Sequence, residues 1–152
     1  SVLYPNINVL TSFPSEDKMW LKKLDQAFSE FGHKIVVLDD DPTGTQTVHG
    51  VPVYTDWDTE TLRQAFHDKG TMFFILTNSR SFSAEKTAIL HRSIAVSLSV
   101  ISREMNIPFL LISRGDSTLR GHYPLETDIL RDTLSKGTTF HTVGGNKKRE
   151  NT

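Results

Sequence analysis

The chain has 152 residues, with 17 Lys or Arg and 18 Asp or Glu, so its formal net charge is −1. This length fits one domain, and the nearly balanced charge excludes the broad basic surface by which proteins bind nucleic acid or anionic lipid. The absence of Cys excludes disulfides and thiolate chemistry and favours a reducing, cytoplasmic compartment. No stretch approaches the roughly 20 apolar residues of a membrane span, so we expect no membrane partner.

The first predicted element is a helix near the start of the chain. Ser15 stands at an N-cap position, and Gly32 is a typical helix stop. Apolar residues recur between them at the spacing of one helix face: Trp20, Leu21, Leu24, Phe28 and Phe31. The apolar run at 34–38 follows, and its β-branched residues predict a buried parallel strand.

A weaker strand and a short helix are predicted next. Residues 51–57 favour a strand at the edge of a sheet, because Pro52 cannot donate a ladder hydrogen bond. Asp58 is a candidate N-cap for a helix that closes by Gly70. The apolar residues of this helix are Leu62, Ala65 and Phe66.

The longest helix is predicted between two further apolar strands. Residues 71–76 and 108–112 have the composition of short buried strands. Ser83 is a candidate N-cap for the helix between them, and Asn106 marks its end. Its apolar stripe consists of Leu90, Ile94, Leu98, Ile101 and Met105. A last helix is predicted to begin near Pro124, because proline suits the first helical position.

This alternation of strands and helices predicts an α/β fold. We expect an open, mainly parallel sheet with helices on both faces, in a Rossmann-like three-layer arrangement with right-handed crossovers. Three buried strands are few for this class, and the pattern stops after Gly137. We therefore expect an incomplete domain over residues 1–137 and a flexible or unrelated tail over residues 138–152.

Each of the three buried strands ends in a group of polar residues. The groups are 39–44, 77–81 and 113–121. Ligands of open parallel sheets bind outside the carboxyl ends of the strands, so we expect the three groups to form one crevice. The alternative is that these are ordinary polar loops without a ligand. This explains a single group more readily than it explains three groups at three strand ends.

Three carboxylates open the first group. Asp39, Asp40 and Asp41 repel one another unless cations, hydroxyl donors or helix N-termini compensate. Such a cluster suits a polyhydroxylated ligand or a metal ion bridged to phosphate. Thr43 and Gly44 follow in a tight turn, where the glycine permits close approach of a ligand to the backbone. The alternative is an acidic turn held by its own hydrogen bonds.

Arginines and hydroxyls dominate the other two groups. The second group contains Ser79, Arg80 and Ser81. Its arginine either binds a carboxylate or phosphate with two hydrogen bonds or pairs with the Asp cluster for structural reasons. The third group contains Arg114, Asp116, Ser117, Thr118, Arg120 and Gly121. This set precedes a helix and suits an anion, and its Asp suits a general base; a capping loop with surface arginines is the alternative. Together the groups predict a pocket for a sugar acid or sugar phosphate.

The polar groups also carry a family resemblance. In order, the blocks 39–50, 77–81 and 113–126 resemble the sugar-binding N-terminal domain of the four-carbon acid sugar kinases. The resemblance covers residues 34–134, and the first and third blocks are most specific as a pair. It implies ATP-dependent phosphorylation of a hydroxyl group on a tetronate or 3-oxo-tetronate.

The resemblance implies roles for residues at the matching positions. Asp116 and Asp41 are the candidates for the catalytic base that accepts the hydroxyl proton. The candidates for substrate binding are Asp39, Asp40, Thr43, Gly44, Ser79, Arg80, Ser81, Arg114, Ser117, Thr118, Arg120 and Gly121. Gly115 departs from the family pattern, in which a side chain is more usual, and this departure predicts a looser loop.

Cofactor and partners also follow from the resemblance. In the family, a C-terminal domain binds ATP, with Mg²⁺. This sequence has neither a Gly-x-x-x-x-Gly-Lys-[Ser/Thr] loop nor a Gly-x-Gly-x-x-Gly loop, so we expect no cofactor site here. The expected partners are the sugar acid and the missing nucleotide-binding domain, and the chain alone is expected to bind substrate without turnover.

Two other functions stay open. Asp39, Asp41 and Thr43, spaced by single residues after an apolar strand, also match the first motif of haloacid-dehalogenase-like phosphatases, in which an Asp attacks phosphate beside Mg²⁺. The downstream Lys and acidic pair of that class are missing. The other alternative is a non-catalytic binding module or fragment.

The six histidines form no metal-binding motif. They are His33, His49, His67, His91, His122 and His141. Their spacing lacks His-x-His and His-Glu-x-x-His, so we expect surface or loop positions and no metal site. We expect His122 near the mouth of the pocket.

Overall fold

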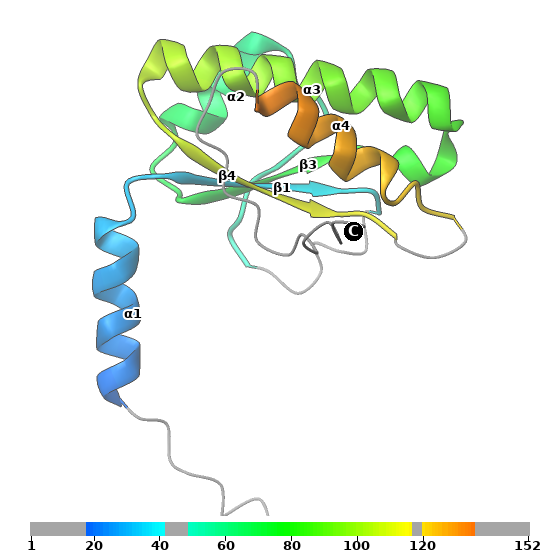
Figure 1. Ribbon diagram of the computed structural model, residues 1–152. Coiled ribbons are helices and arrows are strands. Elements are labelled where there is room, and N and C mark those ends of the chain that lie inside the picture. Colours follow the sequence, from blue (N-terminus) through cyan, green and yellow to red (C-terminus); the bar gives the residue numbers. More distant parts are fainter. Residues whose placement is uncertain (1–17, 42–48, 117–119, 136–152) are drawn as a thin grey trace, which may run out of the picture. The chain divides into compact units, whose positions relative to one another are not determined.

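The computed structural model describes residues 18–41, 49–116 and 120–135 (Figure 1). The chain divides into two units, Ser1–Gly32 and His33–Thr152. The predicted N-cap Ser15 and the predicted tail lie outside the described residues. None of the described helices is long and apolar enough to cross a membrane.

The described residues of the first unit form the helix α1 (Lys18–Glu30). It carries the predicted apolar face, on which Trp20, Leu24 and Phe28 are largely exposed. Near the end of the helix, Gln26 Nε2 donates a hydrogen bond to Glu30 Oε1 at 2.9 Å. The helical spacing therefore predicted the element correctly, although apolar spacing alone does not tell which surface covers such a face.

The second unit is built on a parallel sheet of four strands. They are β1 (Lys34–Asp39), β2 (Val53–Tyr54), β3 (Met72–Leu76) and β4 (Phe109–Arg114), in the order β2-β3-β1-β4. The predicted open parallel sheet is confirmed, with the short β2 at one edge. In the register, Asp39 lies beside Leu76 on one side and Arg114 on the other, so the carboxyl ends of three adjacent strands are level.

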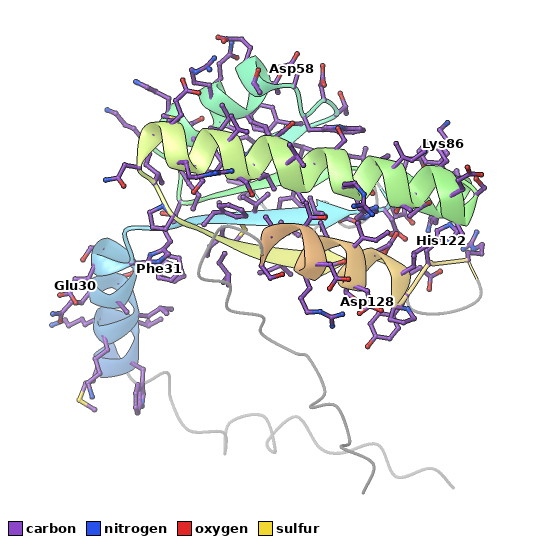
Figure 2. The ribbon with its side chains drawn as sticks, turned by 45° about the horizontal axis from the view of Figure 1, so that its top comes forward. Glu30, Phe31, Asp58, Lys86, His122 and Asp128 are labelled. Carbon is purple, nitrogen blue, oxygen red and sulfur yellow. The ribbon has the colours of Figure 1, made fainter. Side chains whose placement is uncertain are left out.

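The described part of this unit also has two helices and a short 3₁₀ turn between strands, and a third helix that follows β4. The helices are α2 (Thr59–His67), α3 (Ala84–Met105) and α4 (Leu125–Leu134), and the turn is η3 (Ser79–Ser81). Asp58 caps α2 by accepting a hydrogen bond from the Thr61 amide at 2.7 Å. Ser83 caps α3 by accepting one from the Lys86 amide at 3.3 Å; Asp58 and Lys86 mark these helix starts in Figure 2. Both predicted caps are confirmed.

The helices α2, α3 and α4 lie on one face of the sheet (Figure 1). The path of the chain explains this arrangement. The crossovers β2-α2-β3 and β3-α3-β4 run across the sheet in the same direction, and right-handed crossovers in one direction place their helices on one face. We expected helices on both faces of the sheet. In the described part of this unit, α2, α3 and α4 all lie on the same face.

A single apolar cluster fills the space between the helices and the sheet. Phe66 of α2 packs edge to face against Phe73 and Phe109, with ring centroids 5.8 and 6.1 Å apart. The α3 stripe contributes Leu90, Ile94, Leu98 and Ile101, all at most 8 % exposed. Full burial of each such side chain stabilises the fold by about 1.5–3 kcal/mol, so this cluster is what holds the strand ends in place.

Candidate functional site

The polar residues that follow β1, β3 and β4 lie at the carboxyl edge of the sheet. The backbone joins two of these groups directly, because the Thr77 amide donates to the Asp39 carbonyl oxygen at 2.7 Å. The Thr77 hydroxyl lies 3.1 Å from the same oxygen. The loop after β3 is thereby fixed against the end of β1.

Residues at and after the ends of β1, β3 and β4 contact one another at this edge. Arg80 Nη1 lies 2.5 Å from Asp41 Oδ2, and both side chains are about one-fifth exposed. The Asp116 amide donates a hydrogen bond to Asp40 Oδ2 at 2.8 Å. Arg114 Nη1 lies 3.6 Å from the Asp39 carboxylate. The structure thus brings together six of the predicted site residues, namely Asp39, Asp40, Asp41, Arg80, Arg114 and Asp116.

Asp39 is the most deeply buried of the three carboxylates. The residue is 2 % exposed, and its Oδ1 accepts a hydrogen bond from the Asp41 amide at 3.1 Å. Its Oδ2 is buried and has no hydrogen-bond partner among the described residues. Burial raises the pKa of the Asp39 carboxyl, against the opposing effects of the Asp41 amide and of Arg114. A buried acceptor without a donor costs free energy, so this atom suits a hydroxyl donor from a ligand.

The remaining candidates of the loop after β3 have other surroundings. Ser79 is 1 % exposed, and its hydroxyl donates to Glu126 Oε1 at 2.7 Å, so it faces the protein interior. Ser81 is exposed, and its hydroxyl donates to Asn78 Oδ1 at 3.1 Å. The convergence therefore depends on Arg80 and not on the two serines beside it.

The candidates of the loop after β4 are described in part. Arg120 is exposed. Gly121 lies against the backbone of Asp116, where a Cβ atom would occupy the position of the Asp116 carbonyl oxygen. Gly121 is thus required by close packing within the loop. The candidates Thr43, Gly44, Ser117 and Thr118 lie outside the described residues.

Two buried residues beneath the edge were missed by the sequence analysis. Glu126 of α4 is 3 % exposed, and His91 of α3 is 2 % exposed, with its Nε2 atom 3.8 Å from Glu126 Oε1. The expected surface or loop position is wrong for His91, which lies on the inner side of α3. His122 donates from Nε2 to the Phe82 carbonyl oxygen at 2.9 Å (Figure 2). Glu126 is the last residue of the third block that carries the family resemblance, and this block is the signal that could have found it.

The same contacts bear on metal binding and on the phosphatase alternative. In the described ranges, no three His, Asp or Glu side chains are grouped so that they could hold a metal ion. Asp39 is buried beside the half-exposed Arg114, and Asp41 is paired with Arg80. Nothing in these contacts favours the phosphatase reading.

Comparison with known proteins assigns the family. The model of the sugar-binding N-terminal domain family matches residues 35–145, which is more than half of the chain and includes all three polar groups. No curated protein and no solved structure matches the chain. The matched range contains the parallel sheet from Ile35 onward and the edge where the acidic and guanidinium groups meet. By this match, the chain belongs to the family of sugar-binding N-terminal domains.

Proposed function

We propose that this chain binds a four-carbon sugar acid, of the tetronate or 3-oxo-tetronate type, at the carboxyl edge of its sheet. In this proposal it is the sugar-binding part of an ATP-dependent kinase that phosphorylates a hydroxyl group of that acid. The observation that carries the proposal is the pairing of Asp and Arg side chains there, with Arg80 2.5 Å from Asp41 and Arg114 3.6 Å from Asp39. The sugar-binding character of the family supports it independently.

The two kinds of side chain suit the two kinds of group in a sugar acid. A guanidinium group binds a carboxylate through two parallel, charge-assisted hydrogen bonds, so Arg80 and Arg114 are the proposed partners of the ligand carboxylate. Ionised carboxylates only accept hydrogen bonds, so Asp39 and Asp40 are the proposed partners of its hydroxyl groups. The Oδ2 atom of Asp39, which accepts no hydrogen bond from the described residues, fits this assignment.

Within this chain, the chemical task is to orient one hydroxyl group and to take its proton. In the proposed step, the hydroxyl oxygen bonds to the γ-phosphorus as ADP leaves, and the hydroxyl proton passes to a carboxylate. Asp116 and Asp41 are the candidate bases. Asp41 is paired with Arg80, and the backbone of Asp116 is held by Asp40, so both candidates lie at the same edge.

ATP and Mg²⁺ supply the phosphoryl group and its charge compensation in this reaction class. The described residues offer no group of three His, Asp or Glu side chains to a metal ion. In line with the family resemblance, the proposal assigns the nucleotide and the metal to a separate nucleotide-binding domain and leaves the sugar acid to this chain.

Calorimetric titration of the chain tests the binding half of the proposal. D-threonate is expected to bind, and threitol, which keeps the four-carbon polyol but lacks the carboxylate, is expected to bind more weakly. Arg80→Gln is expected to weaken D-threonate binding by roughly 10- to 100-fold, the usual loss for a charge-assisted hydrogen bond. The matched control is Arg131→Gln, which removes an arginine that pairs with Asp128 on the exposed side of α4.

Three results would contradict the proposal, each in a different part. No heat of binding with any four-carbon acid would refute the ligand class. Equal affinity for D-threonate and threitol would refute the role of the arginines. Turnover of D-threonate with ATP by this chain alone would refute the assignment of the nucleotide to another domain.

A further inference from the structure

A buried polar cluster lies directly beneath the proposed sugar-acid site. Its members are Thr77, Ser79, Thr87, His91 and Glu126, all at most 4 % exposed. The proposed function uses none of their side chains. Burying a carboxylate and an imidazole is costly unless both are well partnered, so the contacts of Glu126 and His91 call for an explanation.

His91 holds one side of this cluster. Its Nδ1 atom lies 2.9 Å from the Thr87 carbonyl oxygen. A carbonyl oxygen only accepts hydrogen bonds, so Nδ1 carries the hydrogen and Nε2 is the atom that faces Glu126. The Thr87 hydroxyl in turn donates to the Ser79 carbonyl oxygen at 3.3 Å. The first turn of α3 is thereby tied to the loop after β3.

Glu126 contacts two different loops with its two carboxylate oxygens. Oε1 accepts the hydrogen bond of the Ser79 hydroxyl at 2.7 Å, in the loop after β3. Oε2 lies against Gly115, in the loop after β4, so closely that a Cβ atom on Gly115 would collide with it. The glycine that was expected to loosen its loop instead leaves room for this carboxylate.

The two contacted residues stand next to residues of the site. Ser79 precedes Arg80, and Gly115 precedes Asp116. We propose that Glu126 is a positioning residue that fixes the separation between Arg80 and Asp116, and that Gly115 is required because a side chain there would displace the Glu126 carboxylate. This inference rests on the proposed function for its consequence, namely that the anion-binding and proton-accepting groups are held ready at the right spacing before ligand enters.

A double-mutant cycle tests this role. Gly115→Ala is expected to weaken D-threonate binding by about tenfold or more, because small displacements of preorganised groups are costly. Glu126→Asp retracts the carboxylate and is expected to weaken binding as well. In the double variant, the shorter acid no longer collides with the added methyl group. The double variant is therefore expected to lose no more D-threonate affinity than either single variant. Independent, additive losses would overturn the proposal.

Matched controls separate positioning from general damage. Gly70→Ala adds a methyl group at a site where the nearest atom is an ordinary 3.7 Å away. Glu104→Asp shortens an exposed acid that binds Arg63 at 3.1 Å near the C-terminal end of α3. Both are expected to leave D-threonate affinity unchanged. Urea denaturation of every variant reports stability, which a merely structural role would lower without changing the affinity of the folded protein.

A second measurement needs no ligand. The Asp116 amide, which donates to Asp40, is expected to exchange its hydrogen faster in Gly115→Ala, while the amides of the buried Ile94 turn exchange as in the unmodified chain. If the unmodified chain binds no sugar acid, the proposed function fails, and this exchange measurement alone decides the positioning role. Unchanged exchange at Asp116 in Gly115→Ala would overturn it.

Discussion

The interior of the helix-covered face and the carboxyl edge are built from the same strands but differ in what they bury. In the interior, Val36, Phe73 and Ile75 are at most 2 % exposed and belong to one apolar cluster. At the edge, Asp39 and Glu126 are at most 3 % exposed, yet both are acids. Along β1 the change occurs from Leu38 to Asp39, and after β3 it occurs from Ile75 to Thr77.

This difference separates stability from function. Apolar burial contributes about 25 cal/mol for each Å² removed from water, whereas burial of an acid lowers stability unless its partners compensate. The Oδ2 atom of Asp39 has no hydrogen-bond partner among the described residues. The edge therefore reduces stability, the interior offsets that reduction, and the two regions are expected to respond differently to mutation.

The largest expected effect is on stability, from the interior. Phe66→Ala removes a ring that packs against Phe73 and Phe109, and the free energy of unfolding is expected to fall by about 3–5 kcal/mol. Chemical denaturation measures this loss. Ile89→Ala on α3, where the side chain is 65 % exposed, is the matched control and is expected to change little.

Ligand binding in the same variant sharpens the comparison. The fraction of Phe66→Ala that stays folded is expected to bind D-threonate as the unmodified chain does, because Phe66 lies in α2, which supplies no proposed ligand contact. Phe66→Leu serves as the milder form if the alanine variant does not fold. A loss of affinity in folded protein would show that interior and edge are coupled.

An intermediate effect is expected from Gly121→Ala at the edge. The new methyl group would meet the Asp116 backbone, and overpacking of this kind costs about 1–3 kcal/mol. In contrast to the interior variant, D-threonate binding by the folded protein is also expected to fall, because Asp116 moves. Denaturation and calorimetry on one preparation measure both quantities; retained affinity would contradict the close packing of this loop.

The smallest expected effect, and one of opposite sign, comes from Asp39→Asn. Burial raises the pKa of this carboxyl above its ordinary value of 3.8. In the pH window between the ordinary and the raised pKa, the folded state holds a proton that the unfolded state has lost. The free energy of unfolding therefore falls as pH rises through the window, by about 1.4 kcal/mol for each unit of raised pKa. Removing the charge is expected to abolish this slope and to raise stability at neutral pH.

The same substitution is expected to weaken binding of D-threonate, since the amide no longer offers an ionised acceptor to hydroxyl groups. Stability and affinity then change in opposite directions, which is typical of a residue kept for function. Asp132→Asn, at a side chain that is 72 % exposed on α4, controls for loss of a negative charge. A lower stability of Asp39→Asn at neutral pH, with the slope retained, would contradict this account.

Much of the fold was predictable because its signals are local. The caps Asp58 and Ser83 and the αL residue Asn106, with φ of 54°, are set by side chains within a few residues of the helix ends. Three of the strands follow from short apolar runs and the fourth was predicted as a weaker edge strand, and the parallel order places three polar groups at one edge. β2 is short, Val53–Tyr54, and Pro52 directly before it has no amide hydrogen to donate to a neighbouring strand.

The parts that escaped prediction depend on contacts between distant segments. Ser79 and Glu126 are 47 residues apart in sequence, and no spacing rule brings them together. His91 stands beside the apolar stripe of α3, where a polar residue looks like a surface residue until α4 covers it. Which face of the sheet the helices cover depends on the order of the strands, which local patterns do not contain.

The ion pair between Arg80 and Asp41 has a consequence for selectivity. In the proposed binding, a ligand carboxylate competes for Arg80 with the Asp41 carboxylate that is already paired with it, so the loss of this ion pair offsets part of the gain from the new charge-assisted hydrogen bonds. Chloride or acetate would then compete poorly. All small acids share the negative charge, so in the proposed site the pattern of hydroxyl groups distinguishes a four-carbon sugar acid from other small acids.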